Sequence, residues 1–199
     1  MFTMQQQDAL AGLFMSRCEQ IVPSLSELTG HTVLLEVPRI RLQPLAQLPD
    51  TLSELADNDV AAVHQVLAGP LASDALLVLN LRKAVALTNL LSADRPSLPK
   101  LDASDREALT EVANNLINAC LGALSDLLHN PIAFAVPHLR LISLSGLLHS
   151  LAISEDDRHD GLVLTVDFLL RESTLRSYLI VVLDSVATNR LLEAVELAR

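Results

Sequence analysis

Four polar side chains near the middle of the chain are the groups best suited to chemistry. Glu111, Asn114, Asn115 and Asn118 follow the spacing i, i+3, i+4 and i+7, which places them together on one stripe of an α-helix. Each Asn disfavours a helix interior by about half a kcal/mol relative to Ala. A carboxamide can orient a water molecule for attack. A merely solvated helix face explains the same pattern, so the spacing alone does not establish a site.

The helix that would carry this row is predicted over about residues 104–128. Ser104 and Glu107 have the spacing of a capping box at its start. Apolar residues at helical spacing predict a buried stripe on the other side of the helix, and the stripe consists of Leu109, Val112, Ala113, Leu116, Ile117, Cys120, Leu124 and Leu127. Cys120 is expected to act there as a small buried apolar residue, and Cys18 is similarly placed on an earlier helix.

An internal repeat organises the whole chain. The run Val37-Pro38-Arg39-Ile40-Arg41-Leu42 recurs as Val136-Pro137-His138-Leu139-Arg140-Leu141, at an offset of 99 residues. Other matches occur in the same order, and the offset grows to about 101 near the end of each copy. We therefore expect a single domain, residues 1–199, built from two halves: about 7–93 and about 104–199, joined by a connector at about 94–103.

Each half is predicted to have the same elements. In the first half, a long helix (about 7–28) precedes an extended Val-Pro segment, two strands (60–67 and 75–81) and a closing helix (83–91). In the second half, the long helix is at about 104–128, the two strands are at 162–169 and 178–184, and the closing helix is at 186–198, with an extra short helix at 144–151. Alternation predicts a half-buried strand at 162–168, and residues 179–183 are expected to be buried on both faces. The prolines should lie at a sheet edge or a bulge. The fold class is α+β: two pseudo-symmetric halves, with two long helices packed on an antiparallel sheet.

Composition excludes several classes of protein. The chain is 50% hydrophobic and carries a net charge of −10, so it is too apolar for intrinsic disorder and too acidic to favour nucleic acid. No apolar run approaches the roughly 18–20 residues that cross a bilayer, so we expect no membrane span. Two cysteines and a start without signal-peptide character predict a reduced, cytoplasmic setting. The histidines lack metal-ligand spacing, so no metal site is expected.

The segment from Asp105 to Asn114 resembles the Glu-x-x-Asn helix of the CheC/CheX/FliY family of chemotaxis phosphatases, and the duplicated halves resemble CheC in particular. The resemblance implies a CheC-like fold and hydrolysis of the aspartyl phosphate on a CheY-like response regulator receiver domain. Asn114 would orient the attacking water, and Glu111 would contact the active-site lysine of the partner. Asn115 and Asn118 are then expected to bind the partner. The Mg²⁺ would belong to the response regulator, so this chain would need no cofactor of its own.

The chain departs from the CheC pattern in its first half. The 99-residue offset places Gly12 opposite Glu111 and Met15 opposite Asn114, so we expect no catalysis there. One alternative is a non-catalytic binding module related to FliM; the end of this chain at Arg199, after a helix, is expected to favour the phosphatase. Another alternative is a regulator that binds the deamidase CheD. The oligomeric state stays open, a homodimer included.

Overall fold

The computed structural model describes residues 2–30, 32–56, 58–68, 73–91, 99–152, 159–170 and 173–197. Residues 94–98 of the expected connector lie outside these ranges. The first half contains α1 (Met4–Thr29), β1 (Val33–Pro44), the 3-10 turn η1 (Leu45–Gln47), α2 (Leu48–Thr51), the 3-10 turn η2 (Ser53–Leu55), β2 (Asp59–Ala68), β3 (Ser73–Asn80) and α3 (Leu81–Leu91). The second half contains α4 (Ala103–Leu128), β4 (Ala133–Phe134), β5 (His138–Ser143), α5 (Leu144–Ala152), β6 (Asp160–Leu170), β7 (Ser173–Leu183) and α6 (Ser185–Leu197).

The strands form one sheet whose order reflects the duplication. The order is β1-β6-β7-β3-β2, and β4 and β5 pair in turn with the free edge of β2. Every neighbouring pair is antiparallel. By the repeat, β2 of the first half corresponds to β6 of the second, β3 corresponds to β7, and β1 corresponds to β4 and β5 together. When each strand is replaced by its counterpart, the strand order reads the same from the opposite edge of the sheet. The predicted α+β architecture with pseudo-symmetric halves is confirmed.

The strand register repeats as well. Leu42 faces Leu162 across β1 and β6, and Leu141 faces Ala61 across β5 and β2. The register of β1 shifts between Glu36 and Arg39, and the corresponding edge in the second half is interrupted between β4 and β5. The prediction that both Val-Pro segments lie at an edge or a bulge is therefore confirmed, as expected for residues that cannot complete a ladder.

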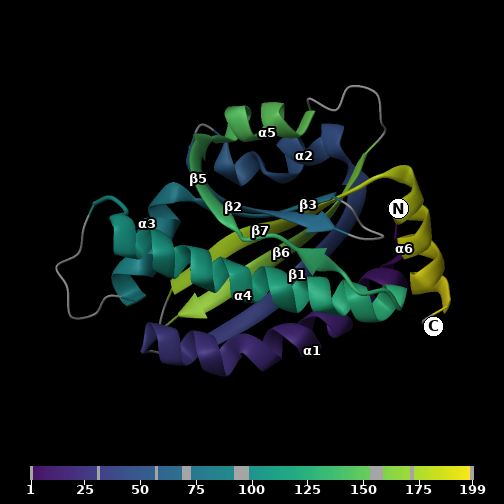
Figure 1. The fold of residues 1–199 in the computed structure, drawn as a ribbon, viewed down its shortest axis with the longest axis horizontal. Helices are drawn as coiled ribbons and strands as arrows, with labels where there is room; N and C mark the ends of the chain where they lie inside the picture. The colour runs from purple at the N-terminus through teal and green to yellow at the C-terminus, as the bar shows by residue number, and fades with distance from the viewer. Residues whose placement is uncertain are drawn as a thin grey trace.

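Helices cover both faces of the sheet. The long helices α1 and α4 lie side by side on one face, while α2 and α5 lie on the other (Figure 1). Each sheet face has its own buried cluster: Leu77 and Leu179 pack toward the long helices, whereas Val78 and Ile180 pack toward α2 and α5. The predicted short helix at 144–151 is α5. None of the described helices is both long enough and apolar enough to pass through a bilayer.

One predicted burial pattern is wrong. Residues 162–168 are buried on both faces of β6, including Thr165 and Asp167, so the alternation in the sequence does not mark an exposed face. The Asp167 carboxylate is satisfied inside the protein, because Arg176 donates two hydrogen bonds to it, each 2.9 Å long. Arg176 also contacts Glu54 at 3.1 Å. A polar residue in an alternating strand can thus be buried when a paired charge accompanies it.

The predicted capping box at Ser104 and Glu107 is also wrong, because α4 begins earlier. Asp102 is the N-cap; its carboxylate accepts from the Asp105 amide at 2.8 Å, and Asp105 accepts from the Asp102 amide at 3.0 Å. The 99-residue offset places this pair opposite Thr3 and Gln6, which form the capping box of α1. The reciprocal cap is therefore part of the duplicated unit. Each box satisfies two backbone donors at its helix start.

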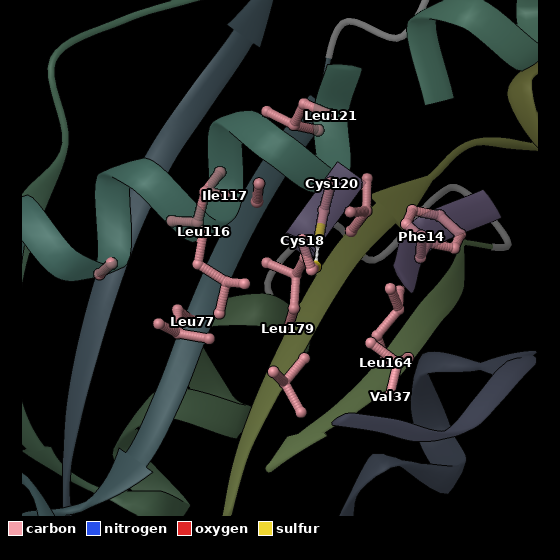
Figure 2. Packing of buried hydrophobic residues seen from close by; sticks show 14 of the residues in the cluster. Phe14, Cys18, Val37, Leu77, Leu116, Ile117, Cys120, Leu121, Leu164 and Leu179 are labelled. Carbon is pink, nitrogen blue, oxygen red and sulfur yellow. Dashed lines mark hydrogen bonds between the residues drawn. The ribbon is translucent and has the colours of Figure 1, made fainter. Parts of the chain in front are cut away.

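The interface between α1 and α4 is tightly packed (Figure 2). Phe14 and Cys18 of α1 and Leu116, Ile117 and Cys120 of α4 are completely or almost completely buried. The two sulfur atoms lie 3.9 Å apart. The hydrogen bond with Cys18 and burial raise the pKa of the Cys120 thiol well above its ordinary value. Both cysteines behave as the buried apolar residues that the helical pattern predicts.

Candidate functional site

Helix α4 places the polar row on the side away from its core stripe. Val112, Ala113, Leu116 and Ile117 are buried against the sheet and α1, and this fixes the rotation of the helix. The predicted site residues differ in depth: Glu111 is exposed, whereas Asn114, Asn115 and Asn118 are half-buried. Their positions along the helix bring all four onto the same side, as the spacing indicates.

Glu111 and Asn114 open onto a shallow hollow of about 420 Å³. One wall is α4 and the other is Pro137, just before β5. The lining residues are Arg106, Glu107, Thr110, Glu111, Asn114 and Pro137. The hydroxyl of Thr110 donates to the Arg106 carbonyl at 2.7 Å, so the helix backbone occupies that donor. Two carboxylates, a carboxamide and a guanidinium group therefore meet at one open depression.

Asn115 and Asn118 do not line this hollow. Asn118 instead donates from Nδ2 to Oδ1 of Asn114 at 3.2 Å, one helical turn away. Its own Oδ1 is buried and accepts no hydrogen bond. The structure thus connects Asn118 to the site through Asn114, and it leaves Asn115 half-buried beside them.

Exposed apolar residues border the hollow along the β4 edge. Val136, next to Pro137 in sequence, is 73% exposed, and Phe134 is 43% exposed. Phe134 pairs with Leu67 at the end of β2, where Val66 is also exposed. Apolar side chains gathered at a surface in this way are typical of a protein contact.

Sequence reasoning did not identify Arg106, Glu107, Thr110 or Pro137 as part of the site. A signal existed for Pro137, because the repeated Val-Pro dipeptide already marked it. No pattern indicated that the edge strand reaches α4 at this point, since that proximity arises only from the pairing of β5 with β2. Thr110 directly precedes Glu111 on α4, and Arg106 lies five residues before Glu111.

The two positions of α1 that correspond to Glu111 and Asn114 carry no comparable groups. Gly12 is exposed, and a Cβ atom built there would contact nothing within 4 Å. Met15 is half-buried and packs against the core. Neither residue can bind a lysine or orient a water molecule.

Other parts of the molecule offer less chemistry. A cavity of about 920 Å³ lies between η1, α2, α5 and the start of α6, and aliphatic and proline side chains form much of its wall. His64 and Asp74 form a pair at 2.6 Å on the α5 side of the sheet, at a small pocket that Arg140 also lines. Among the residues that the structure describes, no group of three or more His, Cys, Asp or Glu could hold a metal ion.

Comparison with known proteins identifies the fold. No protein-family model and no curated protein sequence matches the chain. Among solved structures, Thermotoga maritima FliY is similar, with a TM-score of 0.72 and 15% identity over 100% of this chain and 99% of that one. FliM in the FliG–FliM complex from H. pylori is similar at a TM-score of 0.64 and 8% identity, covering 96% and 100% of the two chains. A CheC-like superfamily protein from Shewanella sp. PV-4 has a TM-score of 0.50 and 13% identity, covering 85% and 97%.

Proposed function

With its CheC/CheX/FliY-like fold as the premise, we propose that this chain is a phosphatase for the aspartyl phosphate of a CheY-like receiver domain. The observation that carries the proposal is the placement of Glu111 and Asn114, one helical turn apart, at an open hollow. An open depression suits a group presented by another protein better than a small molecule, which normally needs an enclosing pocket. The bordering Val136 is exposed to meet such a partner.

In the proposed reaction, the Asn114 carboxamide holds a water molecule in line with the phosphorus–oxygen bond of the receiver. The water oxygen bonds to phosphorus, and the bond to the aspartyl oxygen breaks. The products are the free carboxylate, inorganic phosphate and a proton released to solvent. Glu111 pairs with the receiver's active-site lysine and thereby orients the two proteins. Positioning of this kind supplies most of the catalysis in phosphoryl transfer.

The receiver would supply Mg²⁺ together with the phosphoryl group, and that ion would neutralise charge developing on the phosphoryl oxygens. The role left to this chain is to orient water and to dock. One neutral side chain, Asn114, and one anionic side chain, Glu111, at an open surface are sufficient for that role.

A non-catalytic binding module is the second candidate. It is favoured by the likeness to FliM, one of whose structures is a complex with FliG. In that case Glu111 and Asn114 would contact a flagellar or chemotaxis partner, CheD included, without turnover. The two candidates make different predictions for the same mixture of proteins.

The test combines binding with phosphate release. The purified chain is titrated against receivers, each phosphorylated and unphosphorylated, and against CheD, while phosphate release is followed. We expect tighter binding to one phosphorylated receiver and faster loss of its phosphate. Glu111→Ala should lower turnover by up to about 100-fold because the two proteins are no longer held in register. Glu193→Ala, at an exposed position on α6, serves as the control. Binding without any acceleration of decay would reject the phosphatase and favour the binding module.

A further inference from the structure

The contact between Asn118 and Asn114 has the geometry of an orienting device. The Asn118 Nδ2 atom lies 3.2 Å from Asn114 Oδ1, and both side chains are half-buried on the same face of α4. An Asn side chain rotates easily about its last torsion angle, and its two ends have opposite hydrogen-bonding roles. A donor placed at Oδ1 therefore selects one of the two orientations of the Asn114 carboxamide.

The selected orientation leaves hydrogen-bonding groups of the Asn114 carboxamide available to the reaction. With Oδ1 turned toward Asn118, the Asn114 Nδ2 atom keeps both N–H donors for the hollow, and Oδ1 keeps a second lone pair. The amide can then donate to a phosphoryl oxygen and accept from a water molecule. A freely rotating amide would spend part of its time with these roles exchanged.

Asn118 also lowers the stability of the folded protein in a way that the fold itself does not require. Its Oδ1 atom is buried and has no hydrogen-bond donor. Such an orphaned acceptor destabilises a folded protein, and an apolar side chain of similar shape is usually tolerated as well or better. A costly polar group next to a candidate site is typical of a functional constraint.

We infer that Asn118 is a positioning residue that holds the Asn114 carboxamide in the orientation needed for catalysis. This inference rests on the proposed phosphatase function, and it assigns Asn118 to a place behind the site, whereas the sequence pattern predicted direct contact with the partner. It predicts that changes at Asn118 alter the chemical step and leave docking largely intact.

Two variants test the inference in opposite ways. Asn118→Leu removes the donor and the orphaned acceptor together. Its turnover should fall about 10-fold, its binding to the beryllofluoride-loaded receiver should change less than about twofold, and its urea midpoint should stay equal or rise. A purely structural residue would instead lower the midpoint. Asn118→Asp can only accept, so it should reverse the amide and lower turnover further than Asn118→Leu does.

The added charge of Asn118→Asp needs its own control. Gly122→Asp places a carboxylate one turn further along the same face, where an added Cβ meets nothing within 4 Å. It should lower turnover by less than about threefold, as a charge acting from a greater distance in water does. An equal loss in Gly122→Asp and Asn118→Asp would overturn the inference, because charge alone would then explain both.

A measurement that needs no receiver separates this inference from the proposed function. The ¹⁵N order parameter of the Asn114 side-chain amide should fall clearly in Asn118→Leu relative to the unmodified chain. An unchanged order parameter would overturn the inference even if the phosphatase is active. If the order parameter falls but no receiver loses phosphate faster, the positioning contact stands and the proposed reaction is wrong, which contradicts the assigned role of Asn118 in catalysis.

Discussion

Helices α1 and α4 are the same element built twice and put to different uses. Each contains 26 residues, begins with a reciprocal capping box and ends with a left-handed residue, Gly30 or His129. Both bury an apolar stripe against the same sheet face. They differ at the positions of the Glu-x-x-Asn pair, where α4 carries Glu111 and Asn114 and α1 carries Gly12 and Met15. The scaffold therefore constrains caps and core, while the outward stripe is free to gain or lose chemistry.

The edge strands beside these helices differ even more. Leu35 and Val37 of β1 are buried, 5% and 6% exposed, whereas their counterparts Phe134 and Val136 are 43% and 73% exposed. In the first half a continuous strand packs under α1. In the second half that strand is divided into β4 and β5, and the residues between them remain at the surface. The half with the polar row is thus also the half with an open apolar edge.

The largest expected effect separates the two edges. Val37→Asp should lower the free energy of unfolding by about 3–5 kcal/mol, because it buries an unpaired charge. Val136→Asp should change it by no more than about 0.5 kcal/mol, as for an ordinary surface substitution. Urea unfolding followed by circular dichroism measures both. Equal losses would mean that Val136 is covered and that the second edge is closed like the first.

A smaller effect is expected at the seam between the halves, where Tyr178 of β7 faces Val78 of β3. Burial, followed by the nearby Glu54 carboxylate, raises the pKa of Tyr178 to about 12. A raised folded-state pKa gives stability that is complete below the unfolded pKa of about 10 and is lost as pH rises toward 12. We expect a loss of about 3 kcal/mol across that window.

The measurement at the seam is direct, because Tyr178 is the only tyrosine and the chain has no tryptophan. Absorbance at 295 nm should titrate near pH 12 in the folded protein and near pH 10 in urea. Tyr178→Phe should remove the alkaline loss of stability. A folded-state midpoint near 10 would show that the seam around Tyr178 is open to solvent.

The two caps should contribute nearly equally. Thr3→Ala and Asp102→Ala each remove one side of a capping box, and each should cost about 1 kcal/mol of unfolding free energy. Chemical denaturation of both variants, with exposed Ser104→Ala as the control, measures the difference. A large loss from Ser104→Ala would restore the later helix start that the sequence pattern suggested.

The smallest effect is expected from rebuilding the polar pair in the first half. Gly12→Glu with Met15→Asn, introduced into an Asn114→Ala background, should restore less than about a twofold acceleration of receiver dephosphorylation. The reason is that Leu35 and Val37, the counterparts of the exposed Phe134 and Val136, are buried and so offer no apolar surface for docking. Strong recovery would show that a Glu-x-x-Asn pair on this scaffold is sufficient without such an edge.

Periodicity and the repeat predicted most elements and the fold class, because both depend on local spacing and on apolar residues that recur in each half. Local spacing and the repeat could not predict three features of the structure. The start of α4 at Asp102 competes with an equally good local signal at Ser104, and comparison with Thr3 was needed to choose. Burial of Asp167 depends on Arg176, which comes from the next strand. The approach of Pro137 to Asn114 depends on long-range strand pairing.

The contrast between α1 and α4 is tested most directly by one pair of variants. The rate of phosphate loss from the cognate phosphorylated receiver is measured with the unmodified chain, Asn114→Ala and Met15→Ala. We predict that Asn114→Ala returns the rate to that of the receiver alone, while Met15→Ala, at the equivalent place on α1, stays within about twofold of the unmodified chain. Full activity in Asn114→Ala would contradict the assignment of the site to α4.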